Sequence, residues 1–132
     1  MRVVFDTNIF ISAFITPGGR AEAAWLGAIE GRFSLFTSVP ILTETASKLR
    51  EKFKWDDEHI TAAVRHAAAV ATVVKPAMKV AVLADEPDNR ILECALAARA
   101  ALLVTGDRHL LALGSYQSVS VISLAKFLES MP

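Results

Sequence analysis

The chain has 132 residues, with 14 basic and 14 acidic side chains and a formal net charge of +0. Apolar residues make up 53% of it and the mean hydropathy is +0.40, which excludes a disordered chain. The balanced charge excludes a basic field over the whole surface, so nucleic-acid binding would need a local patch or a bound metal ion. The length predicts one domain over residues 1–132, and no apolar run approaches the roughly 20 residues of a membrane span.

Two features indicate the cell compartment. Cys94 is the only cysteine and cannot form an internal disulfide, which suits a reducing environment. Asp6 and Asn8 interrupt the apolar core that a secretion signal would need. We therefore expect a cytoplasmic protein.

The first predicted strand ends at a carboxylate. Residues 3–5 are apolar without alternation, which is typical of a strand buried on both faces in a parallel sheet. Asp6 follows at its carboxyl end, the edge at which open α/β sheets bind ligands. The next predicted elements are a helix over 9–15, a turn over 16–19, an amphipathic helix over 20–30 and a strand over 33–36.

The middle of the chain predicts two helices. Residues 39–50 carry an apolar stripe, and Glu44 lies off the middle of that stripe. A solvated glutamate is the alternative interpretation of Glu44. The acidic start at 56–58 predicts a second helix, which we expect to continue to about Val74.

A second acidic stretch follows an expected brief strand or extended segment over 80–83. Asp85, Glu86 and Asp88 stand at the start of a helix that we expect to run through Ala98. Helix capping and the helix dipole account for one or two of these acids, but not for all three. At least one of the three acids is therefore a candidate functional residue.

The last part of the chain repeats the pattern of the first. A buried strand over 101–105 precedes Asp107 and a helix start at 108–111, just as residues 3–5 precede Asp6. A strand over 119–122 and a closing helix complete the chain. The alternation predicts an α/β domain.

Four carboxylates are expected to converge. Right-handed crossovers place the carboxyl ends of parallel strands at one edge, so Asp6 and Asp107 should lie close together. Asp88 at its helix start can face the same edge, and Glu44 can reach over it. Four carboxylates in one cleft repel one another unless a divalent cation lies between them, and oxygen ligands select Mg²⁺ or Mn²⁺.

These residues lie in stretches that resemble the PIN-domain nucleases, in particular small prokaryotic members regarded as toxins of toxin–antitoxin pairs. Besides Glu44 in its helix, the matching stretches are Val4-Phe5-Asp6-Thr7-Asn8, Asp85-Glu86-Pro87-Asp88-Asn89-Arg90 and Val104-Thr105-Gly106-Asp107-Arg108-His109-Leu110-Leu111.

The resemblance implies a three-layer α/β/α fold with a doubly wound, mostly parallel sheet, and a Mg²⁺- or Mn²⁺-dependent ribonuclease. It assigns Asn8 and Thr105 to the polar neighbours that orient Asp6 and the attacking water. The family's acidic quartet, which holds the metal, corresponds to Asp6, Glu44, Asp88 and Asp107.

The chain departs from the family pattern at two places. His109 stands where many relatives carry a further acid, so one carboxylate ligand is missing. Glu86-Pro87 replaces the more usual Pro-Asp order, which makes Asp88 the choice for the site and Asp85 the fallback.

The resemblance also concerns substrate and partners. Arg20, Arg90 and Arg108 flank the acidic stretches and are candidates for holding RNA phosphates, and solvated or ion-paired surface arginines are the alternative. A cognate antitoxin and a homodimer are the expected protein partners. The stretch around Phe53 and Trp55 is a candidate interface, unless Trp55 covers the core.

Two other functions compete with the ribonuclease. The first is a different Mg²⁺ enzyme on a similar sheet, such as a small phosphohydrolase. Phosphotransferases with an aspartyl nucleophile usually carry a second Asp two residues later, and this chain has Asn8 there, which argues against them. The other alternative is a catalytically inactive RNA- or protein-binding module. The presence of all four acids argues against it, as does the lack of a basic, aromatic surface.

Overall fold

The computed structural model describes all residues, 1–132, and is built around one six-stranded sheet. The strands are β1 (Arg2–Phe5), β2 (Ser34–Thr37), β3 (Thr72–Val73), β4 (Leu102–Val104), β5 (Ser115–Tyr116) and β6 (Val119–Ile122). Their order across the sheet is β3-β2-β1-β4-β6-β5, and only the β5–β6 pair is antiparallel. The prediction of a mostly parallel sheet is confirmed.

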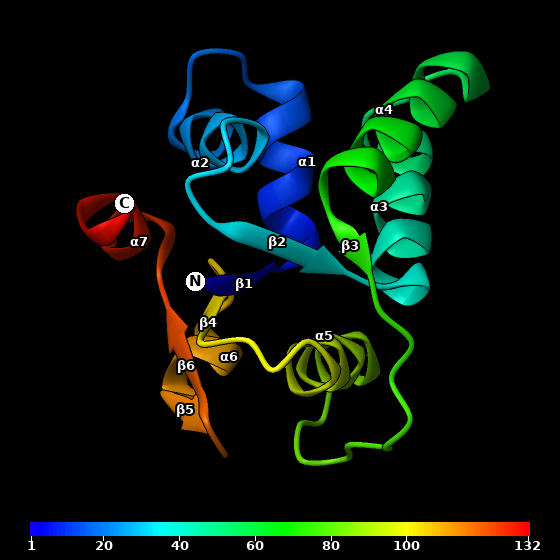
Figure 1. Ribbon diagram of the computed structural model, residues 1–132. Helices are drawn as coiled ribbons and strands as arrows, with labels where there is room; N and C mark the ends of the chain where they lie inside the picture. Colours follow the sequence, from blue (N-terminus) through cyan, green and yellow to red (C-terminus); the bar gives the residue numbers. More distant parts are fainter.

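Helices cover both faces of the sheet. They are α1 (Thr7–Ile15), α2 (Arg20–Ile29), α3 (Val39–Glu51), α4 (Asp57–Val70), α5 (Glu86–Ala97), α6 (Arg108–Leu113) and α7 (Leu124–Ser130). In Figure 1, α1 and α2 lie on one side of the sheet and α5 lies on the other. The three-layer α/β/α architecture expected from the sequence is therefore confirmed. None of the helices is both long enough and apolar enough to span a membrane.

The central strand β1 is buried on both faces, as its uninterrupted apolar run predicts. Val3, Val4 and Phe5 are all fully buried. The ring of Phe5 packs edge-on against Phe10 of α1, with 5.6 Å between ring centroids, and against Phe127 of α7, at 6.2 Å. This packing fixes the direction of β1 and hence the position of the residue that follows it.

The sheet topology brings the ends of β1 and β4 together. β1 pairs in parallel with β2 on one side and with β4 on the other. The strands that follow β1 in the chain are added first on the β2 side and later on the β4 side, so the order of strands reverses at β1. Phe5 is opposite Val104 in the register, and Asp6 N–H donates to Val104 C=O at 2.9 Å. Ligands of open α/β sheets bind at such a switch point.

Two sequence predictions in the middle of the chain need correction. The helix expected to reach Val74 ends at Val70, and Thr72–Val73 form the edge strand β3, in which Thr72 is opposite Phe36. β-branched residues fit an extended strand better than a helix, and pairing with β2 outweighs the Ala-rich helical pattern before them. Residues 80–83 were expected to form either a brief strand or an extended segment. They form no strand, so the strand prediction is wrong.

Smaller differences concern the ends of elements and two side chains. α1 begins at Thr7 rather than at residue 9, because Asp6 caps it. The strand β5 was not predicted; it follows Gly114, whose φ of 71° ends α6. Trp55 packs against a small cluster around Ile60, whereas Phe53 is exposed. Cys94 is fully buried in the core, and this burial raises the pKa of its thiol to about 12.

Candidate active site

A polar cavity of about 220 Å³ lies at the carboxyl edge of the sheet. Its residues come from the end of β1, from α1 and α3, from the start of α5 and from the segment after β4. No apolar side chain lines it apart from a proline, and five of its residues are acidic. The full lining is Asp6, Asn8, Glu44, Lys48, Asp85, Pro87, Asp88 and Asp107. All four predicted acids, the fallback Asp85 and Asn8 are therefore brought together.

One threonine hydroxyl connects the ends of the two central strands. Thr105 is fully buried; its Oγ1 donates to Asp6 Oδ2 at 2.6 Å and accepts from the Asp107 backbone N–H at 2.9 Å. Asp107 also caps α6, because its Oδ2 accepts from Leu110 N–H at 3.3 Å. The relative position of Asp6 and Asp107 is thus set by the sheet and by a single side-chain oxygen.

Asp6 is buried, with 3% of its surface exposed. Burial raises the pKa of its carboxyl above the ordinary 3.8, and nearby Glu44 adds to this. The hydrogen bonds from Thr105 and from Asn8 N–H, together with the charge of Lys48, act in the opposite direction on the pKa. Burial is the largest of these effects, so the net direction is a raised pKa for the Asp6 carboxyl.

Asp88 is the most strongly perturbed carboxyl of the site. It is 8% exposed, and burial, followed by the charges of Asp107 and Asp85, raises its pKa from 3.8 to about 7. Asp85, the exposed residue before α5, lines the same cavity but caps the helix with no side-chain hydrogen bond. Crowded, partly desolvated carboxylates of this kind are common at sites that bind a cation.

Lys48 was missed by the sequence analysis. Its ammonium donates to Asn8 Oδ1 at 3.1 Å and lies 3.7 Å from Glu44 Oε1, one helical turn earlier in α3. The Glu44–Lys48 spacing of four residues was the available signal. The side chain of Asn8 therefore contacts Lys48, and only its backbone N–H donates to Asp6, to Oδ1 at 3.4 Å.

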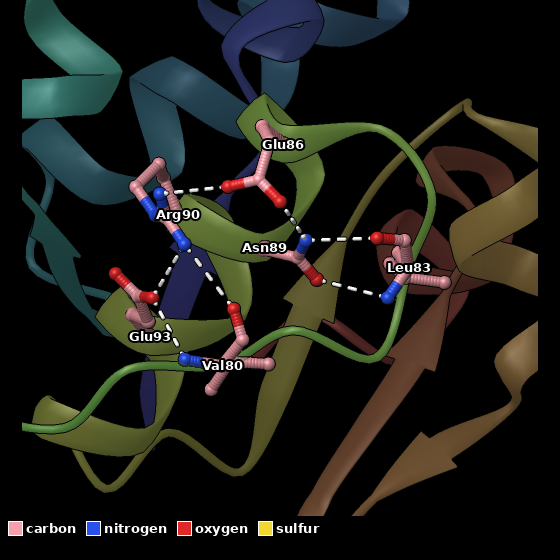
Figure 2. A network of polar contacts seen from close by, with 6 residues as sticks. All are labelled: Val80, Leu83, Glu86, Asn89, Arg90 and Glu93. Carbon is pink, nitrogen blue, oxygen red and sulfur yellow. Dashed lines mark hydrogen bonds and ion pairs between the residues drawn. The ribbon is translucent and has the colours of Figure 1, made fainter.

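A polar network fixes the start of α5 and was also missed (Figure 2). The buried Asn89 side chain accepts from Leu83 N–H at 3.0 Å and donates to Leu83 C=O at 2.9 Å, as a neighbouring strand would. Glu93 Oε2 accepts from Val80 N–H at 2.8 Å. Side chains of α5 thus bond the backbone at both ends of the segment, at Val80 and at Leu83, and hold it against the helix without a strand partner.

The predicted phosphate-binding arginines do not line the carboxylate cavity. Arg90 binds Glu86 Oε2 at 3.1 Å and Glu93 Oε2 at 2.8 Å, which matches the ion-paired alternative (Figure 2). Arg20 and Arg108 are exposed at the first residues of α2 and α6. His109 borders a separate small cavity together with Asp85 and Asp88.

The carboxylates share a cavity without forming a closed ligand set. No group of three or more His, Cys, Asp or Glu side chains is arranged as a ready-made metal site. Their donor atoms are nevertheless all oxygens, which suit hard divalent cations rather than zinc. The arrangement can concentrate cations and hold a polar substrate at the edge of the sheet.

Replacing Asn89 with Ala should lower the free energy of unfolding by about 1–3 kcal/mol, because both backbone groups of Leu83 lose their partner in a partly buried place. Urea unfolding followed by circular dichroism measures the change. An unchanged midpoint would mean that the 80–85 segment does not depend on this amide.

Comparisons with known proteins identify relatives of this arrangement. A family model described as the PIN domain matches residues 2–109. The protein MJ1680 of Methanocaldococcus jannaschii is 31% identical over 118 residues, which are 86% of this chain and 75% of that protein.

Two solved structures share the fold. A chain in the crystal structure of VapBC2 from Rickettsia felis, bound to a DNA fragment from their promoter, aligns with a TM-score of 0.68 and 14% identity over 93% of this chain and 98% of its own. The PIN domain of T. brucei RRP44 aligns with a TM-score of 0.51 and 13% identity over 96% of this chain and 78% of its own. At these identities the likeness concerns the fold alone.

Proposed function

The chain belongs to the PIN domain family, and from this premise we propose that it is a metal-dependent endoribonuclease that hydrolyses RNA phosphodiesters. The observation that carries the proposal is the convergence of Asp6, Glu44, Asp88 and Asp107 on one cavity. We take residues 1–132 as one such domain. Because the chain resembles toxins of toxin–antitoxin pairs, we propose that it acts as the toxin of such a pair.

The carboxylates would hold Mg²⁺ or Mn²⁺. Asp6, Asp88 and Asp107 are the proposed ligands, assisted by Glu44. The fit is supported by the all-oxygen donor set and by the crowding that raises the pKa of Asp88 to about 7, which a cation would relieve. Bound there, the ion would make a water molecule more acidic and offset the charge on the departing oxygen.

The protein's own groups supply position and proton transfer. Thr105 holds Asp6 and the Asp107 backbone in fixed relation, so these two carboxylates are oriented before substrate arrives. Glu44 is the proposed acceptor of the proton from the attacking water. Lys48, which touches Glu44 and Asn8, places one positive charge where the negative phosphodiester would enter.

The first test is cleavage of a mixed-sequence RNA by purified protein with Mg²⁺, with Mn²⁺ and with EDTA. Metal-dependent cutting that disappears in Asp107→Asn supports the proposal, because the contaminating nucleases in both preparations are the same. Equal cutting by both proteins contradicts it.

The inactive binding module remains the second candidate, and Lys48 is the observation that favours it. Its ammonium offsets part of the negative charge of the five acids in the absence of a metal ion, so the cavity could serve a fold that binds a partner without cutting it. RNA binding that is tight in EDTA and produces no cleavage in Mg²⁺ or Mn²⁺ would favour this module.

An antitoxin is the proposed protein partner. The fold likeness to a chain of VapBC2 supports it, and so does the acidic cavity, which could accept a basic side chain of an inhibitor. A small gene next to the one for this chain, whose product co-purifies with it and stops cleavage, would establish the pair. The homodimer is tested by sedimentation of the purified protein.

A further inference from the structure

A second cavity, of about 470 Å³, adjoins the carboxylate cavity. It lies where the first turns of α1, α3 and α5 meet, and Glu44 and Pro87 line both cavities. A substrate held at the carboxylates would therefore extend directly into this second space. Neither the roles proposed above nor the comparisons assign it a ligand.

The walls of this cavity suit an uncharged organic group. Its volume is in the range of small-molecule sites, and its apolar lining residues are Val39, Pro40, Ile41, Pro87 and Ile91. Two lining residues keep a buried polar atom with no hydrogen-bond partner, Oγ1 of Thr7 and Nε of Arg90. Mostly apolar walls with a few polar groups are what a ligand needs to be bound in one orientation.

Charge limits what this cavity can take. Glu44 and Glu86 both line it, and the one arginine of the lining, Arg90, is already paired with Glu86 and Glu93 (Figure 2). A phosphate or a carboxylate would meet two glutamates in the lining and no positive charge that is not already paired. The same nucleic acid that offers a phosphodiester to the first cavity offers a neutral, planar base to the second.

We propose that the cavity between α1, α3 and α5 binds one unpaired RNA base next to the phosphodiester at the carboxylates. This inference rests on the proposed nuclease function and adds a base subsite to it. Arg90 is held by Glu86, Glu93 and the Val80 carbonyl, so its guanidinium presents a rigid group to the cavity. Proteins recognise single-stranded RNA by stacking splayed bases on such groups and by bonding their edges.

Two matched variants test the base subsite. Thr43 lines the cavity and is exposed, so Thr43→Trp should fill the space without disturbing the core. Thr61→Trp makes the same change at an exposed position of α4, outside every cavity lining. Val39→Trp, at another exposed residue of the lining, repeats the test if Thr43→Trp fails to fold.

Cleavage is measured on an RNA with a single cut site and on copies that carry an abasic nucleotide on either side of the cut. With wild type and Thr61→Trp, one abasic copy should have a kcat/KM lower by about tenfold or more, the usual size of a base-stacking contribution. Thr43→Trp should cut the intact and abasic RNA at the same reduced rate. Equal cutting of all substrates by wild type would overturn the subsite.

A binding measurement separates this proposal from the nuclease proposal. Adenosine, guanosine, cytidine and uridine are titrated in EDTA and followed by NMR, with ribose as the probe that lacks a base. Wild type and Thr61→Trp should bind at least one nucleoside more tightly than ribose, and Thr43→Trp should not. Binding without RNA cleavage contradicts only the nuclease, whereas cleavage without base-dependent binding contradicts only the subsite. If Thr43→Trp keeps nucleoside binding but loses a protein partner, the cavity belongs to that partner and the base subsite is wrong.

Discussion

An Asp6→Asn variant should lose RNA cleavage by at least about a thousandfold, which corresponds to roughly 4 kcal/mol of lost transition-state stabilisation. Asp6 is buried at the end of the central strand. Its carboxylate accepts hydrogen bonds from Thr105 and Asn8, and the charges of Lys48 and Glu44 act on it. The change removes a negative charge from the cavity and keeps the size of the side chain. Because burial already disfavours ionised Asp6, we expect Asn to leave the fold intact.

Asp56→Asn is the matched control. Asp56 is an exposed carboxylate that caps α4 by accepting from His59 N–H at 2.9 Å, and Asn caps helices equally well. This variant should cleave RNA at the wild-type rate. Calorimetry with Mn²⁺ provides a second readout, because heat of binding should be lost in Asp6→Asn and kept in Asp56→Asn. Equal Mn²⁺ binding by both would remove Asp6 from the ligand set.

The Asp88→Asn variant should be inactive in RNA cleavage and yet melt at a higher temperature than wild type in EDTA at pH 8. The unfolded chain ionises Asp88 near 3.8, whereas the folded protein does so at about 7. Between these values the folded state binds a proton that the unfolded state releases, so the stability of the wild type falls as the pH rises. Because Asn carries no charge, the stability of Asp88→Asn does not fall in this way as the pH rises.

Thermal melts of both proteins from pH 4 to pH 8 in EDTA check this expectation. The difference in Tm should be smallest at pH 4 and should increase until the pH passes about 7. Mn²⁺ should then raise the Tm of wild type more than that of Asp88→Asn, because a cation offsets the repulsion that Asn has already removed. A Tm difference that is the same at pH 4 and pH 8 would mean that Asp88 is not crowded by its neighbours.

The fold was predictable from the sequence where one local pattern determined the structure. The apolar run before Asp6 and the one before Asp107 predicted buried strands, and residues 3–5 of β1 and 103–104 of β4 are indeed buried neighbours. The same logic predicted that the acids would meet, since parallel strands end at a common edge. The assignment of catalytic roles to these acids stays a prediction.

The features that sequence reasoning missed depend on contacts between distant segments. The edge strand β3 exists because β2 offers it backbone partners; residues 72–73 are β-branched, but two such residues do not predict a strand without that neighbour. Asn89 acts on Leu83 through a loop whose shape is set only in the folded chain. Lys48 reaches Asn8 from forty residues away, which follows from the packing of α1 against α3 and not from either helix alone.

The carboxylate cavity has one wall fixed to the sheet and two walls carried by separate helices. Asp6 and Asp107 are tied together through Thr105, whereas Glu44 belongs to α3 and Asp88 to α5. A small tilt of α3 away from α5 would therefore separate Glu44 from Asp88 while Asp6 and Asp107 stayed in place. If the proposed nuclease function holds, a protein that wedged these two helices apart would stop cleavage reversibly from outside the cavity.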